Sequence, residues 1–163
     1  YYPEQGNGTC YGCHAVSPDG RKMSLSRSGQ RDGRLTIIDV AGDAILVQDE
    51  DAKREQCQTW DPTSSKFAGV WSDDPQPDTN IRSRDGQTGA VLENIALGIE
   101  PSHPDWSPAG DRSLFTHVTV HNTSQRPGRG GLSYVQNDGA AWSAPQTLIA
   151  PEDGFNRYYP AFL

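Results

Sequence analysis

The chain has 163 residues, of which 34% are hydrophobic and 21% charged, and its formal net charge is −7. This length allows one domain with a hydrophobic core. An acidic balance without a basic block argues against nucleic acid and anionic membrane surfaces as partners. No apolar run approaches the roughly 18 residues that a membrane-spanning helix needs, so we expect no membrane span.

Turn-forming residues are abundant, with 17 Gly and 12 Pro, and long apolar periodic stretches are absent. This composition favours an all-β chain of many short strands joined by turns. Four Trp, six Tyr and four Phe argue against disorder. The sequence starts at Tyr1 without a Met, so we interpret it as a processed or excised piece whose missing signal peptide says little about compartment.

The first chemical feature along the chain is Cys-Tyr-Gly-Cys-His at residues 10–14, the attachment signature of a c-type haem. In that signature both thiols form thioether bonds to haem vinyl groups, and the adjacent His ligates the iron. Gly12 suits a tight bend because it has no side chain to clash. We therefore predict haem c attached to Cys10 and Cys13, with His14 as an iron ligand.

Other uses of these cysteines stay open. A redox Cys-x-x-Cys pair normally begins a helix, whereas here the flanks are Gly-Asn-Gly-Thr and a strand. A zinc site from Cys10, Cys13, His14 and Cys57 would lack a second close pair of ligands. The third reading is a disulfide, between Cys10 and Cys13 or between Cys13 and Cys57, since the chain has three Cys.

The chain also repeats itself. Three short turns open at Pro18, Pro62 and Pro108, which are 44 and 46 residues apart. The position two residues before each proline is apolar or aromatic: Val16, Trp60 and Trp106. A strand-like run follows each turn: 22–28, 67–72 and 113–120. Further runs at 35–40 and 44–48, at 80–84 and 90–95, and at 132–135 and 141–149 complete about four strands per unit.

A period in the forties built from four strands is typical of a β-propeller blade. We therefore expect blade units at about 10–50, 54–96 and 100–150, with the opening strand of a fourth at 157–163. An all-β sandwich with coincidental turn spacing is the alternative.

Two stretches carry a family resemblance: Val-Ser-Pro-Asp-Gly-Arg-Lys at 16–22 and Asp-Trp-Ser-Pro-Ala-Gly-Asp-Arg at 105–112. Both resemble the Ser-Pro-Asp-Gly-Lys signature of TolB-type, WD-like β-propeller repeats. Unit two departs from it, with Asp-Pro-Thr-Ser-Ser at 61–65. The resemblance implies a propeller of six or more blades, so residues 1–163 are expected to form one segment of a larger or oligomer-closed propeller. Three blades alone would leave two open sheet edges.

The repeat register groups four residues. Cys13, Cys57 and His103 each lie five residues before a turn proline, and Tyr159 would hold the same place in the fourth unit. Because equivalent positions of neighbouring blades lie around the propeller axis, we expect these four residues, the inner-strand ring, at one end of the innermost strands. This makes a Cys13–Cys57 bridge plausible, and it makes His103 a candidate second iron ligand.

Ligation by His14 and His103 would give low-spin iron suited to electron transfer. Met23, the only Met, is the other candidate ligand and would raise the potential, but its place in a strand favours packing. His117 and His121 lie on one face of a strand-like run. We interpret them as exposed histidines rather than a metal pair.

The sequence contains no hydrolase motif such as Gly-x-Ser-x-Gly. We expect an extracytoplasmic, cytochrome c-like β-propeller of the bacterial periplasm or cell surface, acting in electron transfer or redox sensing with a redox partner or another periplasmic protein. The alternative is a haem-free TolB-like module that binds a protein, glycan or other ligand and has structural cysteines. A third reading is the accessory domain of a hydrolase. Fold resemblance alone does not decide among these functions.

Overall fold

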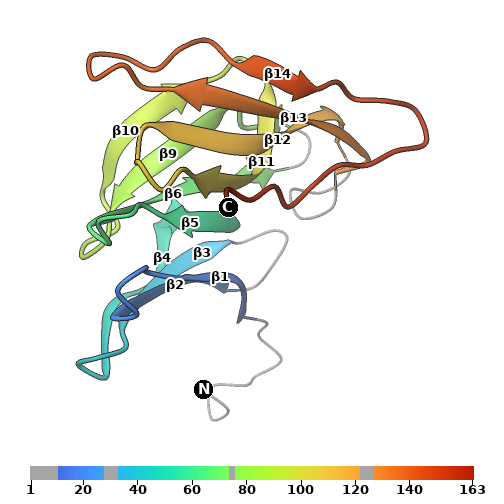
Figure 1. The fold of residues 1–163 in the computed structure, drawn as a ribbon. Coiled ribbons are helices and arrows are strands. Elements are labelled where there is room, and N and C mark those ends of the chain that lie inside the picture. The colour runs from blue at the N-terminus through green and yellow to red at the C-terminus, as the bar shows by residue number, and fades with distance from the viewer. Residues whose placement is uncertain (1–10, 28–32, 74–75, 122–126) are drawn as a thin grey trace.

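A computed structural model describes residues 11–27, 33–73, 76–121 and 127–163. In these residues the chain forms three four-stranded antiparallel sheets and one two-stranded hairpin, and no helix occurs among them. The all-β, three-bladed architecture expected from the repeats is confirmed. We call the three sheets blades 1, 2 and 3 (Figure 1).

Each blade follows the chain from its inner to its outer strand. Blade 1 contains β1 (Tyr11–Val16), β2 (Lys22–Arg27), β3 (Arg34–Asp39) and β4 (Ala44–Arg54). Blade 2 contains β5 (Cys57–Trp60), β6 (Lys66–Val70), β9 (Asn80–Asp85) and β10 (Val91–Ala96), with the hairpin β7 (Ser72–Asp73) and β8 (Gln76–Pro77) inserted after β6. Blade 3 contains β11 (Glu100–Trp106), β12 (Arg112–Val120), β13 (Arg129–Gln136) and β14 (Gln146–Ile149).

The turns between the first two strands of each blade share one backbone conformation. The backbone N–H two residues after each turn proline donates to the carbonyl of the residue directly before that proline: Gly20 to Ser17, Ser64 to Asp61 and Gly110 to Ser107. All three donors have positive φ, at 71°, 60° and 75° respectively. Unit two therefore makes the same turn although a Ser stands where units one and three have Gly.

The last strand of blade 3 is shorter than the sequence predicts. We expected a run over 141–149, whereas β14 begins at Gln146. The Asp138 carboxylate explains the difference, because it accepts the backbone N–H groups of Ala140 and Ala141 at 2.9 Å each and holds that stretch in a turn. The opposite deviation occurs at β4, which continues to Arg54.

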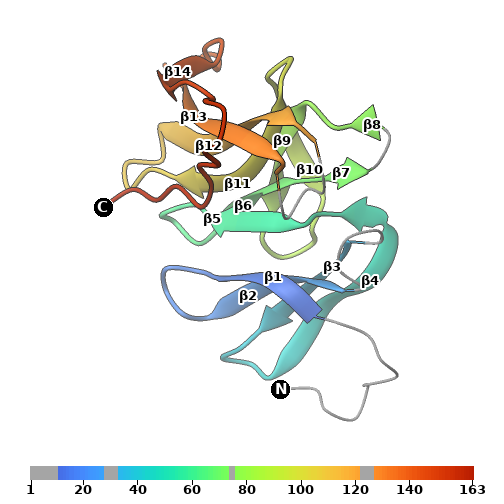
Figure 2. The same ribbon diagram turned by 90° about the vertical axis from the view of Figure 1, so that its right-hand side faces the viewer.

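Blades pack face to face around two apolar clusters. One joins blades 2 and 3: Cys57, Ala68, Val70, Ile81, Ile95, Leu97, Trp106, Phe115 and Val135. The other joins blades 1 and 2: Leu35, Ile37, Val47, Trp60 and Phe67. The inner strands lie side by side, with β5 packed against both β1 and β11 (Figure 2). This stacking brings one end of each inner strand to a common place.

A buried ion pair anchors the connection from blade 1 to blade 2. Glu55, which precedes β5, is fully buried, and its carboxylate accepts a hydrogen bond of 2.6 Å from Nε of Arg84. Burial raises the pKa of Glu55, and the guanidinium groups of Arg84 and Arg82 oppose that shift. A Cβ at Gly69 would lie 2.7 Å from the Glu55 carboxylate, so β6 needs a glycine there.

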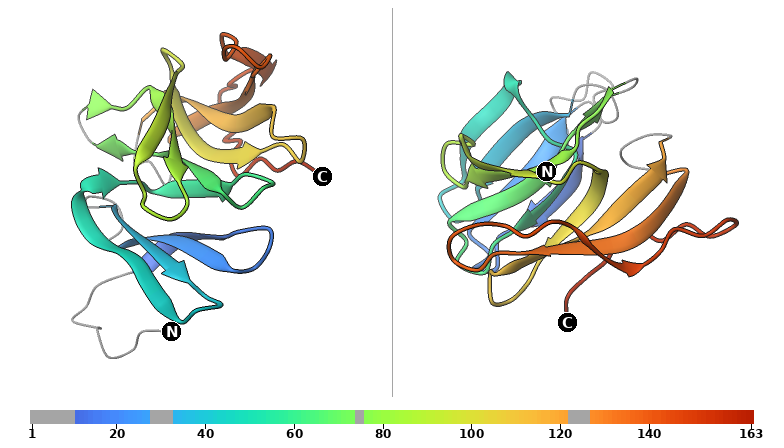
Figure 3. Two further views of the ribbon diagram at one scale, coloured as in Figure 1. Left: turned by 90° about the vertical axis from the view of Figure 1, so that its left-hand side faces the viewer. Right: turned by 90° about the horizontal axis from the view of Figure 1, so that it is seen from above.

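The C-terminal residues return to the inner strands. After β14 the dark red segment passes back beside the third sheet (Figure 3) and ends close to β11 (Figure 1). The backbone N–H of Phe162 donates to the Asp105 carboxylate at 2.7 Å. The other oxygen of that carboxylate accepts from the Thr59 hydroxyl of β5 at 3.1 Å, so Asp105 links blade 2, blade 3 and the C-terminal segment.

Candidate functional site

Three members of the inner-strand ring have a left-handed backbone. Cys13, His103 and Tyr159 have φ of 49°, 46° and 57°, an uncommon conformation for residues other than glycine. In β1 and β11 this conformation falls within a register shift, between Gly12 and Ala15 and between Ser102 and Asp105. Both are β-bulges, which turn a side chain out of the regular alternation of its strand.

The second member, Cys57, lies in a regular stretch of β5, directly opposite Val70 of β6. Its side chain is 7% exposed and lies between the two bulged strands. The Cys57 thiol is hydrogen-bonded to the thiol of Cys13 on one side, and it receives hydrogen bonds from the backbone N–H of His103 and the hydroxyl of Ser102 on the other. The structure therefore brings Cys13, Cys57 and His103 together, as the repeat register predicts.

The two cysteines are present as thiols and not as a disulfide. The hydrogen bond to Cys13 and, after it, burial raise the pKa of the Cys57 thiol well above its usual range. Cys57 is therefore a protonated thiol at neutral pH. Cys13 is half-buried and packs at the margin of the cluster that contains Cys57.

His103 is 4% exposed and electrically neutral. Burial lowers its pKa to about 4. Its ring lies against Tyr159 and Tyr158, with centroid separations of 4.0 and 5.9 Å. Its Nδ1 is 2.8 Å from the Ser102 hydroxyl, whereas its buried Nε2 has no hydrogen-bond partner in the described part of the chain.

The Ser102 hydroxyl can donate to Nδ1 of His103 or accept from it, so the 2.8 Å contact fits both tautomers of the neutral imidazole. With the proton on Nδ1, Nε2 carries a lone pair, as in a metal-binding histidine whose other nitrogen donates to a neighbour.

Three residues of the predicted haem motif remain to be placed: Cys10, Gly12 and His14. His14 follows Cys13 in the bulge and its side chain is exposed. Cys10 lies outside the described residues. Gly12 does not provide the tight bend that we expected of it: its φ is not positive, a Cβ there would meet nothing within 4 Å, and the left-handed residue is Cys13.

The two remaining histidines are less exposed than we predicted. His121 is half-buried, and its Nδ1 lies 2.7 Å from the Glu100 carboxylate. His117 is also half-buried, and burial lowers its pKa. No group of three or more potential ligands close enough to hold a metal ion occurs within the described ranges.

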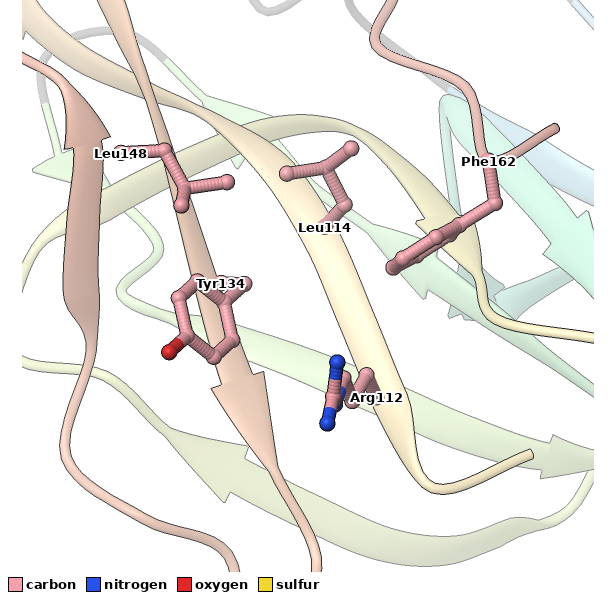
Figure 4. Close-up of a pocket in the computed structure, with 5 residues that line it drawn as sticks. All are labelled: Arg112, Leu114, Tyr134, Leu148 and Phe162. Carbon is pink, nitrogen blue, oxygen red and sulfur yellow. The ribbon is translucent and has the colours of Figure 1, made fainter. Parts of the chain in front are cut away.

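A second candidate site was missed at the sequence level. A cavity of about 190 Å³ lies on the face of blade 3 that points away from blade 2, and Figure 4 shows its lining side chains: Arg112, Leu114, Tyr134, Leu148 and Phe162. Part of the signal is in the sequence, because Arg112 and Leu114 are two residues apart in a strand and therefore share a face. The pairing of Leu114 with Tyr134, which adds the third residue to this face, is seen only in the structure. Phe162 closes one side from the C-terminal segment.

Sheets of this kind, arranged with their inner strands side by side, define the chain as part of a β-propeller. Similar solved structures include hydrazine synthase from Kuenenia stuttgartiensis (TM-score 0.60, 16% identity over 89% of this chain and 43% of that one). TolB from Agrobacterium tumefaciens is also similar (TM-score 0.59, 20% identity over 88% of this chain and 51% of that one). So is a chain of a nidogen–laminin complex (TM-score 0.59, 11% identity over 86% of this chain and 48% of that one). These similarities establish the fold.

No protein-family model and no curated protein matches the chain. The chain spans about half the length of the three similar structures, at 43%, 51% and 48%. Within the described residues, no helix is long and apolar enough to cross a membrane.

Proposed function

We propose that the chain is a c-type haem-binding segment of a β-propeller, in which Cys10 and Cys13 would hold the haem through thioether bonds and His14 would ligate its iron. One observation carries this proposal. The motif ends in a β-bulge that leaves His14 exposed and packs Cys13 against the cluster that contains Cys57. Cys57 in turn adjoins His103, whose buried Nε2 has no hydrogen-bond partner among the described residues. This donor set fits haem c, which takes thiols and neutral imidazoles.

His103 is the residue that would supply a second ligand to the iron. With its proton on Nδ1, 2.8 Å from the Ser102 hydroxyl, the imidazole would offer the lone pair of Nε2 to iron. The ring of Tyr159 lies 4.0 Å from the imidazole and would move aside for this ligation. Two histidine ligands give low-spin iron, so the role we propose is electron transfer or redox sensing with a redox partner protein.

We place this function outside the bacterial cytoplasm, because c-type haem is attached to proteins after they have left the cytoplasm. The resemblance of the turns to TolB-type repeats and the similarity of the fold to TolB support a periplasmic or extracellular site. The acidic net charge of −7 favours a partner with a basic docking surface.

The experiment is expression of the whole chain in a bacterial periplasm together with haem-attachment machinery. We expect a haem α-band in the reduced-minus-oxidised spectrum of the denatured protein, and an intact mass above that of the polypeptide. Cys10→Ala and Cys13→Ala should each impair attachment, whereas the matched control Cys57→Ala should keep it. Intact masses equal to the polypeptide alone for both the unmodified chain and Cys57→Ala under these conditions would refute the haem proposal.

The haem-free alternative also has an observation in its favour. The apolar cavity on blade 3 is open to a protein or other ligand, and the contact between Cys13 and Cys57 suits structural cysteines. The same intact-mass measurement separates the two functions, because the alternative requires a chain without haem in every variant.

A further inference from the structure

We infer that Cys13 and Cys57 form a reversible dithiol–disulfide couple that links blades 1 and 2, and that its oxidised form blocks haem attachment at Cys13. The first half of this inference stands on the geometry of the two thiols. The second half rests on the proposed haem function.

The structure places the two cysteines side by side. Cys13 and Cys57 are on neighbouring inner strands, β1 and β5, at the same position of the repeat, and their thiols are hydrogen-bonded to each other. The strands are already held together beside this pair, because the Trp60 indole N–H donates to the Ala15 carbonyl at 3.0 Å. A bond between the sulfurs therefore needs little movement of either blade.

The left-handed backbone at Cys13 supports the same conclusion. The β-bulge displaces Cys13 from the regular alternation of β1, and its side chain packs at the cluster that contains Cys57. Neighbouring His14 is exposed instead. The bulge thus separates two adjacent side chains, directing the thiol to blade 2 and the imidazole to solvent.

The oxidation requires a disulfide as oxidant, of the kind that glutathione or a thiol oxidoreductase supplies. Together Cys13 and Cys57 lose two protons and two electrons as their sulfurs join. The oxidant's disulfide gains the two protons and two electrons and is reduced to two thiols. Cys13 is exposed on one side and offers the point of attack, whereas Cys57 is buried and resolves the mixed disulfide.

Cys13 can serve only one partner at a time. A thioether bond forms by addition of the thiol across a vinyl double bond, with sulfur on one carbon and hydrogen on the other and no net redox change. That addition needs Cys13 as a thiol, so the disulfide excludes it. Cys57 is not part of the haem motif, and it would therefore set the redox condition under which the motif is usable.

The test begins with the whole chain prepared without haem and equilibrated in buffers of oxidised and reduced glutathione. Alkylation and non-reducing peptide mapping should find a Cys13–Cys57 disulfide in the oxidised buffer, and both residues alkylated in the reduced one. Oxidation should raise the thermal midpoint by at least about 5 °C, because it closes a loop between two blades. Cys10→Ser should retain the disulfide, and Cys57→Ser should abolish it.

A Cys10–Cys13 disulfide, or two alkylated thiols in the oxidised buffer, would overturn the couple. This readout uses the unmodified chain, so it does not depend on whether a variant folds. In the periplasmic expression, Cys57→Ser should raise the fraction of chains with haem at least about twofold over the unmodified chain. An unchanged fraction of chains with haem would show that the Cys13–Cys57 disulfide does not block haem attachment.

The two proposals fail in different ways. Absence of haem from every variant together with a mapped Cys13–Cys57 disulfide refutes the haem function and leaves the redox couple standing. Haem on the unmodified chain with no such disulfide in any buffer refutes the couple and leaves the haem function standing.

Discussion

At the scale of single residues, the inner-strand ring combines backbone strain with buried polar groups. Cys13, His103 and Tyr159 adopt positive φ without being glycine, which costs each about 1–2 kcal/mol. Contacts around the ring offset this strain: Cys13 interacts with Cys57, and the rings of His103 and Tyr159 pack against each other at an interplanar angle of 60°. Strained positions that neighbouring contacts maintain are concentrated at functional sites.

The first prediction concerns the buried imidazole of His103 in the chain without haem. Its folded pKa of about 4 lies below the ordinary value of 6.5, so the unfolded chain binds more protons between these values. We therefore expect the free energy of unfolding to fall as pH decreases from about 6.5 to about 4, by up to about 3 kcal/mol. Urea unfolding across that range measures this slope.

His103→Asn is the matched variant, because Asn tolerates positive φ and does not titrate. It should remove the part of the slope between pH 6.5 and 4 that comes from His103. His117, whose pKa burial also lowers, and Glu55, whose pKa burial raises, contribute to the slope of both proteins, so the difference between the two slopes isolates His103. Asp19, Asp85 and Asp138 add little in this range, since hydrogen bonds to their carboxylates lower their pKa values from 3.8 and their contributions are lost only at more acidic pH. An equal slope in both proteins would contradict the assignment to His103.

At the scale of elements, the backbone conformation of the three turns repeats more closely than their amino-acid sequence does. Gly20 and Gly110 have positive φ, and Ser64 has the same conformation in the turn whose sequence departs from the signature. Ser64 adds a link that glycine could not, since its hydroxyl accepts the backbone N–H of Asp19 at 3.1 Å. This bond joins the turns of blades 1 and 2.

The turn of blade 1 gives the second prediction. Gly20 has φ of 71° and open space around its Cα, so Gly20→Ala adds backbone strain without a steric clash. We expect it to lower the free energy of unfolding by about 1–2 kcal/mol. The control is Gly12→Ala, which also meets open space but lacks positive φ, and which should leave stability unchanged or slightly higher. Guanidinium unfolding compares the two, and a larger loss for Gly12→Ala would contradict this account.

These elements show what sequence reasoning can and cannot reach. The proline spacing predicts three sheets and the common place of Cys13, Cys57 and His103, because turn chemistry and strand period are local properties. It does not predict the bulges, since a left-handed backbone is uncommon for residues other than glycine and nothing in the local sequence marks it at Cys13 or His103. The motif suggested Gly12 as the bend because glycine has no side chain to clash, whereas the left-handed residue is Cys13.

At the scale of the whole molecule, the blades stack through a repeated cation–aromatic contact. Lys22 of blade 1 lies 5.8 Å from the Trp60 ring of blade 2, and Lys66 of blade 2 lies 5.1 Å from the Trp106 ring of blade 3. Arg112 holds the corresponding place in blade 3, and it lines the cavity together with Phe162 (Figure 4). The cavity therefore occupies the position of the next interface between blades, a relation that becomes visible only once the sheets are placed.

That position gives the last prediction, which concerns self-association of the chain. Leu148 is 58% exposed beside the cavity, and exposed apolar faces of this kind drive association. We expect concentration-dependent association in sedimentation velocity, and at least about a tenfold weaker association for Leu148→Lys. Leu92 of β10 is 57% exposed but lies away from the cavity, so Leu92→Lys should change little. Equal effects of the two substitutions, or a monomer at every concentration, would show that this face does not pair with a second copy and leave a further blade as its occupant.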